Sequence, residues 1–442
     1  MTWERYVIGT ATEEEPTVPL HYPLVAMLAV LAAVAPNTWF LPSRQGYYVS
    51  GVILCAIVVY AVFLASVRPW TDSNFLLLFG AYWVGLVVQY HYTAQPELLQ
   101  YVLVTPIVVV ATVIVLPQFV VGRKETFAMA LTLVGVGTAL IGLWLLWRTT
   151  QGDPVTIAGS SPGWVGQEVM GYDGFANMRT VSVFHNPNTY GFFIMITSLA
   201  ALYTLLARRG LLWVVAFGVC LLGLFTSEGD AASLGFAIGA VVLVSGYDTR
   251  LAIASLGVGV VALYGLIRIG HIPEVMETTL MSRVDQWVLS LERIAEDPLF
   301  GIGFGDASSE IGSRYGPHNS FIHALLNAGL IVGSLYLGAL AYAFARGLRR
   351  DWTLWTGFVV GSTVGLFAYM SFESLFLGGL SVSSVVLGIL IGLLVVPERR
   401  DPSTEPATAV DALKRSRIAR VVERIRDRSD SPTDFLPRGE EE

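Results

Sequence analysis

The sequence predicts an all-α integral membrane protein with about twelve transmembrane helices. Of its 442 residues, 54% are hydrophobic and only 14% are charged, whereas soluble domains carry roughly a quarter charged residues. Runs of about 20 apolar residues, the length that crosses the hydrocarbon core, recur along most of the chain. These two observations predict a polytopic membrane protein.

Each predicted span is an apolar run that ends at charged residues, Pro or Gly. We expect a cytoplasmic N-terminal segment over residues 1–19 and a transmembrane domain over residues 20–396. In chain order, the predicted spans are Leu20–Phe40, Tyr47–Val67, Asn74–Tyr90, Leu98–Val120, Thr126–Trp147, Thr189–Ala207, Leu211–Phe225, Ala231–Ser245, Leu251–Ile269, Ser320–Phe344, Trp352–Met370 and Leu375–Val396.

Basic residues predict the orientation of these spans. Alternate connections between the spans differ in charge: one set is rich in Arg, and the other contains Arg44 and almost no other basic residue. The positive-inside rule places the basic set, and with it both termini, in the cytoplasm. Two long loops, 148–188 and 270–319, are then expected outside. Besides the C-terminal tail, the connections expected inside contain Arg68, Arg123, Lys124, Arg208, Arg209, Arg250, Arg346, Arg349 and Arg350.

Two segments outside the spans have amphipathic patterns. The first predicts a helix over Ser282–Glu296, either lying on the outer membrane interface or packed as a cap over the transmembrane helices. The second, in the tail 397–442, predicts a cytoplasmic helix that binds the membrane or a partner, or is solvated, with disordered ends. The apolar positions are Val284, Trp287, Val288, Leu291 and Ile294 in the first, and Val410, Leu413, Ile418, Val421, Val422 and Ile425 in the second.

Composition and cysteine placement exclude several classes of protein. Cys55 and Cys220 fall in separate apolar runs, which predicts buried free thiols rather than a disulfide framework. The acidic run Glu13–Glu15 precedes the first span where the basic part of a secretory signal would lie, so we expect no such signal. The net charge of -7 argues against a nucleic-acid partner.

The stretch Pro298–Gly329 has the features of a site. Its glycines do not match a dinucleotide-binding loop, because no strand precedes them, and they predict a tight turn that folds the loop over the membrane. His318 and Asn319 follow, at the outer mouth of a span. His318 and His323 are spaced i, i+5 and do not share a helical face, so no metal is expected. No P-loop or cofactor motif is present.

Arginines and one histidine are expected to face the outer side. Guanidinium groups bind phosphate through charge-assisted hydrogen bonds, and a neutral imidazole can accept a proton from a hydroxyl. The alternative is that the histidine caps a helix and the arginines contact lipid headgroups or acids. The residues concerned are Arg179, Arg283, Arg293, Arg314 and His318, with the acids Glu228, Asp230, Asp306 and Glu373.

Three segments expected on the outer side carry a shared pattern. They are MRTVSVFHNPNTYG, with Arg179, Phe184, Asn186, Pro187 and Asn188; SRVDQWVLSLERIAEDPLFGIGFG, with Ser282, Arg283, Trp287, Pro298, Gly301, Gly303 and Gly305; and PHNSFIHALLNAGLIVG, with His318, Asn319, Gly329 and Gly333. In this order and on this side, the three segments together resemble the O-antigen ligase and O-antigen polymerase superfamily of membrane glycosyltransferases.

The resemblance implies a GT-C-like enzyme of the plasma membrane, with its active site outside. It would transfer a glycan, with inversion and without a metal, from a polyprenyl- or dolichyl-pyrophosphate carrier to a hydroxyl of a glycan, lipid or protein. His318 would be the general base, and Arg179 and Arg283 would bind the pyrophosphate. Asn188, Asn319 and Arg314 are the further substrate-binding residues expected. Ligase and polymerase both remain open.

The chain departs from the family pattern at two positions. Ser227-Glu228-Gly229 stands where the family often has Ser-Arg-Gly, and Asn327 stands where a glutamate often lies. A secondary transporter or a flippase of lipid-linked sugars is the alternative function, and a membrane scaffold is a third. Charges at the outer ends of spans, without repeated halves, favour the transferase over a transporter.

Overall fold

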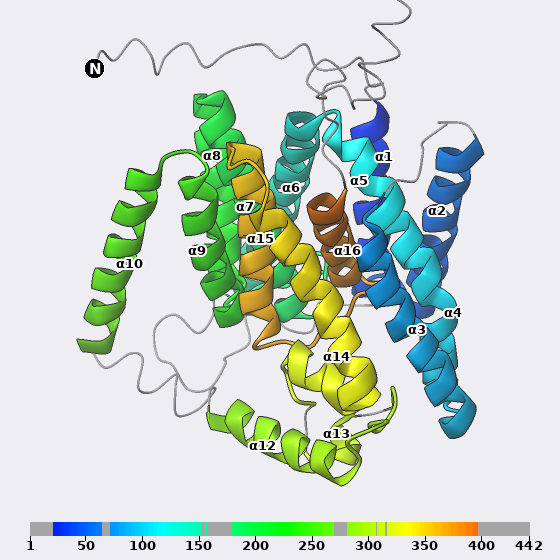
Figure 1. Ribbon diagram of the computed structural model, residues 1–442. Coiled ribbons are helices and arrows are strands. Elements are labelled where there is room, and N and C mark those ends of the chain that lie inside the picture. Colours follow the sequence, from blue (N-terminus) through cyan, green and yellow to red (C-terminus); the bar gives the residue numbers. More distant parts are fainter. Residues whose placement is uncertain are drawn as a thin grey trace, which may run out of the picture. The chain divides into compact units, whose positions relative to one another are not determined.

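The computed structural model describes residues 21–63, 71–151, 155–156, 179–268, 281–305, 307–313 and 316–396 (Figure 1). Within these ranges the elements are helices, and the β pairing is limited to an isolated bridge between Thr38 and Phe184. This confirms the predicted all-α class. The tail stripe, Arg68, Arg314 and most of the loop 148–188 lie outside the described residues.

The helices follow the apolar runs of the sequence closely. They are α1 (His21–Val34), η2 (Ala35–Asn37), α2 (Ser43–Phe63), α3 (Ser73–Thr93), α4 (Pro96–Val109), the π-helical η3 (Val110–Val115), α5 (Leu116–Val121), α6 (Lys124–Thr150), α7 (Pro187–Arg208), α8 (Leu211–Thr226), α9 (Asp230–Ser245), α10 (Thr249–Arg268), α12 (Met281–Glu296), α13 (Ala307–Glu310), α14 (Ser320–Leu348), α15 (Leu354–Met370) and α16 (Val382–Val395).

Among the described residues, 6 helical stretches are long and apolar enough to cross a membrane. They are α2, α3, the continuous α4–η3–α5, α6, α7 and α14. Five further apolar stretches, α1 with η2, α8, α9, α15 and α16, contain 10–17 residues. Length and composition therefore support a polytopic membrane protein.

The last helix begins later than the predicted start at Leu375. Ser381 caps it by accepting a hydrogen bond from the Ser384 amide. Before this cap, Gly378 has a φ of 121°, which non-glycine residues rarely adopt, and Tyr101 Oη donates to the Leu377 carbonyl at 2.5 Å. These contacts hold the connection between α15 and α16 in a non-helical form.

The two cysteines are free, as predicted, but only one is buried. Cys220 is buried on α8, whereas Cys55 is exposed on α2. The buried face of α2 includes Leu54 and Ile57, and each residue advances about 100° around a helix. Cys55 therefore lies beside that face rather than on it.

Helices α9 and α15 pack through facing glycines. A Cβ added at Gly361 would lie 2.5 Å from the Gly239 carbonyl oxygen, and one added at Gly235 would lie 2.5 Å from that of Gly365. Small residues four apart allow such close backbone approach in membrane proteins. The contact fixes α15, whose last turn leads directly to the candidate site.

Helix α14 is broken at Gly329, whose φ of 73° and ψ of 173° are not helical. The segment Pro298–Gly305, which we call the strap, lies in the break. Gly301 and Gly303 have φ values of 65° and 85°, so the predicted tight turn is confirmed. The strap is also hydrogen-bonded to α14 by its backbone. The bonds are Ile302 N to Leu326 O (2.9 Å), Gly303 N to Asn327 O (2.9 Å) and Leu330 N to Pro298 O (2.7 Å).

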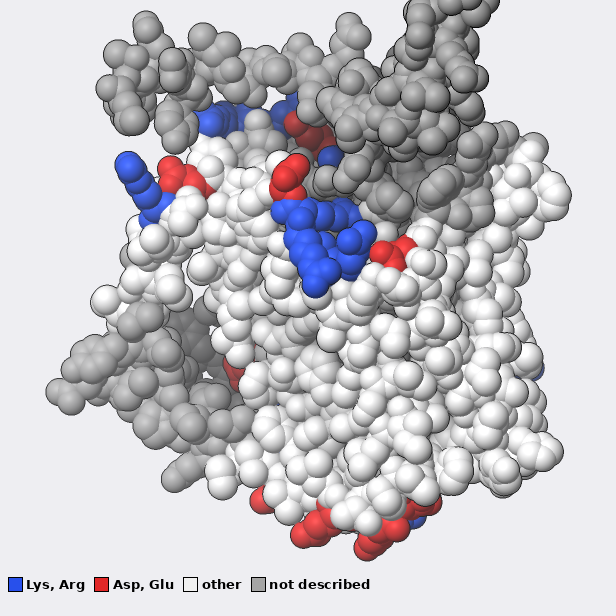
Figure 2. All heavy atoms as spheres, in the orientation of Figure 1, with Lys and Arg blue, Asp and Glu red and all other residues white. Residues whose placement is uncertain are grey.

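Connections that the sequence assigns to one side of the membrane contact each other. On the face seen in Figure 2, Lys and Arg side chains gather toward the upper part, and mostly Asp and Glu mark the lower edge. The contacts are Arg208 with Glu125 (2.7 Å), Arg346 with Asp72 (3.2 Å), Arg209 with Tyr247 Oη (2.5 Å) and Trp352 Nε1 with Ser245 Oγ (3.3 Å).

Candidate functional site

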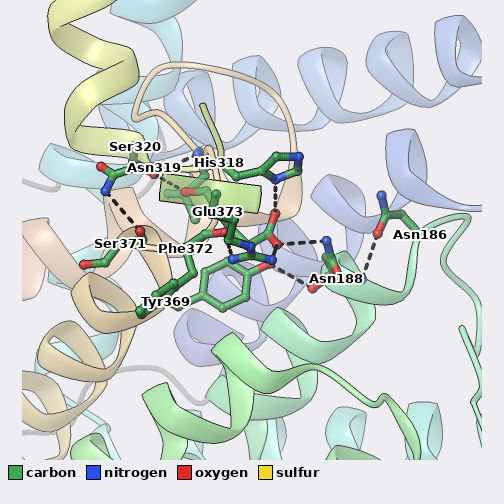
Figure 3. A network of polar contacts seen from close by, with 11 residues as sticks. Asn186, Asn188, His318, Asn319, Ser320, Tyr369, Ser371, Phe372 and Glu373 are labelled. Carbon is green, nitrogen blue, oxygen red and sulfur yellow. Dashed lines mark hydrogen bonds and ion pairs between the residues drawn. The ribbon is translucent and has the colours of Figure 1, made fainter. Parts of the chain in front are cut away.

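The carboxylate of Glu373, in the connection between α15 and α16, joins three predicted site residues (Figure 3). His318 Nδ1 lies 3.3 Å from Glu373 Oε2. Arg283 Nη2 lies 3.2 Å from Oε1, and Asn188 Nδ2 donates to the same oxygen at 2.9 Å. The side chain of Glu373 is only 12% exposed. Residues from α7, α12 and the start of α14 thus meet at one partly buried carboxylate.

The start of α14 is fixed by side-chain caps. Asn319 is the N-cap, because its Oδ1 accepts hydrogen bonds from the Phe321 and Ile322 amides. Its Nδ2 donates to the Ser371 carbonyl at 3.0 Å. Both functional groups of Asn319 therefore hold the helix start beside His318, and its expected substrate contact stays a prediction.

Ser320 ties the same helix start to the connection that carries Glu373. Its Oγ donates to the Glu373 carbonyl at 2.7 Å and accepts from the Leu375 amide at 2.9 Å. On the other side, Tyr369 Oη donates to the Asn188 carbonyl at 3.0 Å. These bonds hold His318 and Asn188 against the Glu373 carboxylate.

The contact with Glu373 defines the chemistry available to His318. A carboxylate beside Nδ1 favours the tautomer in which Nδ1 carries the proton and Nε2 is the basic atom. The side chain of His318 is 31% exposed, so reactants can reach it. His318 is also a non-glycine residue with a φ of 43°, a conformation that persists where surrounding contacts enforce it.

Arg283 lies on the first turn of α12 with its guanidinium turned toward the same connection. Nη1 donates to the Phe372 carbonyl, and the guanidinium carbon lies 5.9 Å from the centre of the Phe372 ring. These two contacts and the ion pair with Glu373 hold the group in place. A guanidinium has five N–H donors, so donors remain for an anion.

Helix α12 separates a buried face from an exposed apolar face. Gln286, Ser290 and Ile294 are buried, whereas Val288 and Leu291 are 48% and 51% exposed. A plain cap would bury the whole apolar stripe, so the exposed apolar residues favour the expected interfacial helix. Arg283 does not belong to the exposed apolar face, because its side chain is 19% exposed and turned toward Glu373.

Arg179 lies in a second charged group, with Glu228 and Asp230 near the start of α9. Burial lowers the pKa of the Arg179 guanidinium, and the two carboxylates oppose that shift. Burial also raises the pKa of the Glu228 carboxyl, which Arg179 opposes and Asp230 reinforces. The acid at the departure Ser227-Glu228-Gly229 therefore partly offsets the charge of Arg179.

The sequence did not single out Glu373 as a site residue, although it is an acid on the expected outer side. The sequence does contain a signal for Glu373. It is an isolated carboxylate between the apolar run that ends at Met370 and the one that begins at Leu375, and acids in such positions are costly and often functional. Asn327, at the other departure, is 4% exposed at the break of α14. The carboxylate that faces His318 therefore belongs to Glu373, and not to the position of Asn327, where the family often has a glutamate.

No model of a known protein family matches this chain, and no curated protein is similar to it in sequence. The site itself, rather than a relative, therefore has to indicate the chemistry. It combines a histidine beside a carboxylate with an arginine and an amide. It suits the removal of a proton beside a bound anion.

Proposed function

We propose that the protein is a membrane glycosyltransferase similar to O-antigen ligases and polymerases. It transfers a glycan from a polyprenyl- or dolichyl-pyrophosphate carrier to an acceptor hydroxyl. The observation that carries the proposal is the meeting of His318, Arg283 and Asn188 at Glu373. These residues belong to the three separate segments on which the family resemblance rests.

In the proposed reaction, His318 Nε2 accepts the proton of the acceptor hydroxyl. The hydroxyl oxygen attacks the anomeric carbon from the face opposite the carrier, and the bond from that carbon to the pyrophosphate oxygen breaks. Glu373 stabilises the resulting imidazolium, as a carboxylate does in other histidine-base sites. Arg283 binds the pyrophosphate through charge-assisted hydrogen bonds, in the bound donor as in the leaving group, and Arg179 is proposed to assist it.

We further propose a GT-C-like arrangement of twelve spans, with both termini in the cytoplasm and the site at the outer face of the plasma membrane. The helix directions support this. Residues at the site lie near the starts of α7 and α14 and the end of α15. The basic residues Arg208 and Arg346 lie at the opposite ends of α7 and α14, and basic connections are characteristic of the cytoplasmic side.

The test is transfer by the purified protein in proteoliposomes, with a pyrophosphate-linked glycan as donor. His318→Ala is expected to abolish transfer without loss of folded protein. Arg283→Ala is expected to raise the donor KM by about tenfold or more, because charge-assisted contacts to phosphate are lost. The matched control is Arg293→Ala on the same helix, which is expected to leave the donor KM unchanged, because Arg293 pairs with Glu296 (3.1 Å) and Glu310 (3.7 Å) rather than with Glu373. Full activity of His318→Ala would exclude it as the base.

A flippase of lipid-linked sugars is the second candidate, and the break in α14 favours it. Discontinuous membrane helices form the substrate sites of many transporters, and α14 is interrupted at Gly329. A flippase moves the donor across the bilayer and leaves it intact. Protein that translocates a labelled donor without consuming it, in the presence of acceptor, would replace the transferase proposal with this one.

A further inference from the structure

Helix α12, which carries Arg283, is held at both of its ends. At its start, Arg283 contacts the Phe372 carbonyl and the Glu373 carboxylate. At its end, the chain passes directly into the strap, Pro298–Gly305, which lies in the break of α14. The position of the strap therefore helps to set the position of Arg283.

Gln89, in the last turn of α3, holds the strap and the break together. Its side chain is 1% exposed. Nε2 donates to the Phe300 carbonyl of the strap at 2.5 Å and to the Asn327 carbonyl of α14 at 2.7 Å. One buried amide group thus connects three segments of the chain.

Gln95, the N-cap residue of α4, forms hydrogen bonds with the strap a few residues after Phe300. Nε2 donates to the Ile302 carbonyl at 3.0 Å, and Oε1 accepts from the Phe304 amide at 3.0 Å. A Cβ added at Gly303 would lie 1.9 Å from Gln95 Oε1. The glycine is therefore needed for this amide to reach the strap backbone.

We infer that Gln89 and Gln95 are positioning residues that fix Arg283 through the strap and so set the affinity for the donor pyrophosphate. This inference rests on the proposed function. The start of α14, with His318, has its own anchors in Asn319 and Ser320. Loosening the strap is therefore expected to affect the arginine more than the base.

The kinetic test uses Gln95→Met, which keeps the side-chain length and removes both hydrogen bonds. We expect the donor KM to rise about tenfold with kcat within about twofold, because a displaced guanidinium loses charge-assisted hydrogen bonds to the donor pyrophosphate. Gln118→Met is the matched control, because Gln118 Nε2 donates to the Ile114 carbonyl of its own helical stretch at 2.8 Å. A fall in kcat at unchanged KM would overturn the inference.

A double-mutant cycle separates positioning of Arg283 from general damage. In an Arg283→Ala background, Gln95→Met is expected to leave the donor KM unchanged, because the group it positions is absent. An equal rise in both backgrounds would show that Gln95 acts by another route. The same cycle is repeated with Gln89→Met. If this variant of the buried Gln89 does not fold, the result for the half-buried Gln95 decides the test.

Hydrogen exchange tests the strap without any activity. The Ile302 and Gly303 amides, which bond to α14, are expected to exchange about tenfold faster in Gln95→Met and at the wild-type rate in Gln118→Met. Unchanged exchange in Gln95→Met would overturn the positioning role. If wild-type protein consumes no donor while exchange rises as expected, the proposed function fails and the strap contact stands.

Discussion

At the scale of single residues, Glu373 is the side chain on which the site depends. Its two carboxylate oxygens face His318, Arg283 and Asn188, and it is 12% exposed. Removing one member of a partly buried charged group leaves the others without compensation. Loss of its charge would leave the basic groups of Arg283 and His318 facing each other with no anion between them.

Glu373→Gln tests this role, because the amide keeps the size of the carboxylate and removes its charge. We expect kcat to fall by about 100-fold or more, because the amide favours the wrong tautomer of His318 and cannot stabilise the imidazolium. Glu296→Gln is the matched control on α12, since Glu296 is 69% exposed and paired with Arg293. Transfer kinetics provide the measurement, and a kcat equal to that of Glu296→Gln would rule out the role.

At the scale of helices, the glycines between α9 and α15 determine where the site segment begins. Gly235 and Gly239 face Gly365 and Gly361 so closely that an added Cβ would meet a backbone oxygen. Backbone cannot move aside as a flexible side chain can. The glycines therefore allow the two helices to approach, and α15 delivers Glu373 three residues after its end at Met370.

Gly361→Ala is expected to destabilise the protein by about 1–3 kcal/mol, because a methyl group is forced into a packed contact. Gly338→Ala in α14 is the control, since nothing lies within 4 Å of an added Cβ there. That change is expected to be neutral or to stabilise by up to about 1 kcal/mol. Thermal unfolding in detergent measures both, and equal effects would contradict the close-packing argument.

At the scale of the whole molecule, the described helices have two chemically different ends. Arg208 and Arg346 lie at the ends of α7 and α14 that are remote from His318 and Asn188. Arg283 and His318 contact Glu373 at the other ends of these helices. This separation is what the positive-inside rule exploits when a chain inserts, and it leads us to propose that the site faces outward.

Cysteine labelling on intact cells tests this orientation. In a background with Cys55→Ser and Cys220→Ser, Asp285→Cys on exposed α12 is expected to react with a membrane-impermeant maleimide. Arg349→Cys is expected to react only after the cells are permeabilised, because the connection after α14 is placed inside. The reverse pattern would place the site in the cytoplasm and exclude an outer acceptor.

The sequence by itself determined the all-α class, the positions of the helices in the apolar runs, and local features such as helix caps and the tight turn of the strap. Gly301 and Gly303 adopt the predicted tight turn, and Asn319, an expected substrate-binding residue, also caps α14. These features depend on run length, on side chains that reach neighbouring amides and on backbone freedom. Each of them is encoded within a few consecutive residues.

Only the tertiary structure decided that Glu373 joins the site, that the strap lies in a broken α14 and that Arg179 has acidic neighbours. The contacts of Glu373 reach residues 55, 90 and 185 positions away in the chain. Such contacts depend on how closely helices approach, which the α9–α15 glycines control, and on the position of the strap, which Gln89 and Gln95 hold. No local pattern specifies which side chains meet, because packing of the whole helix assembly selects the partners.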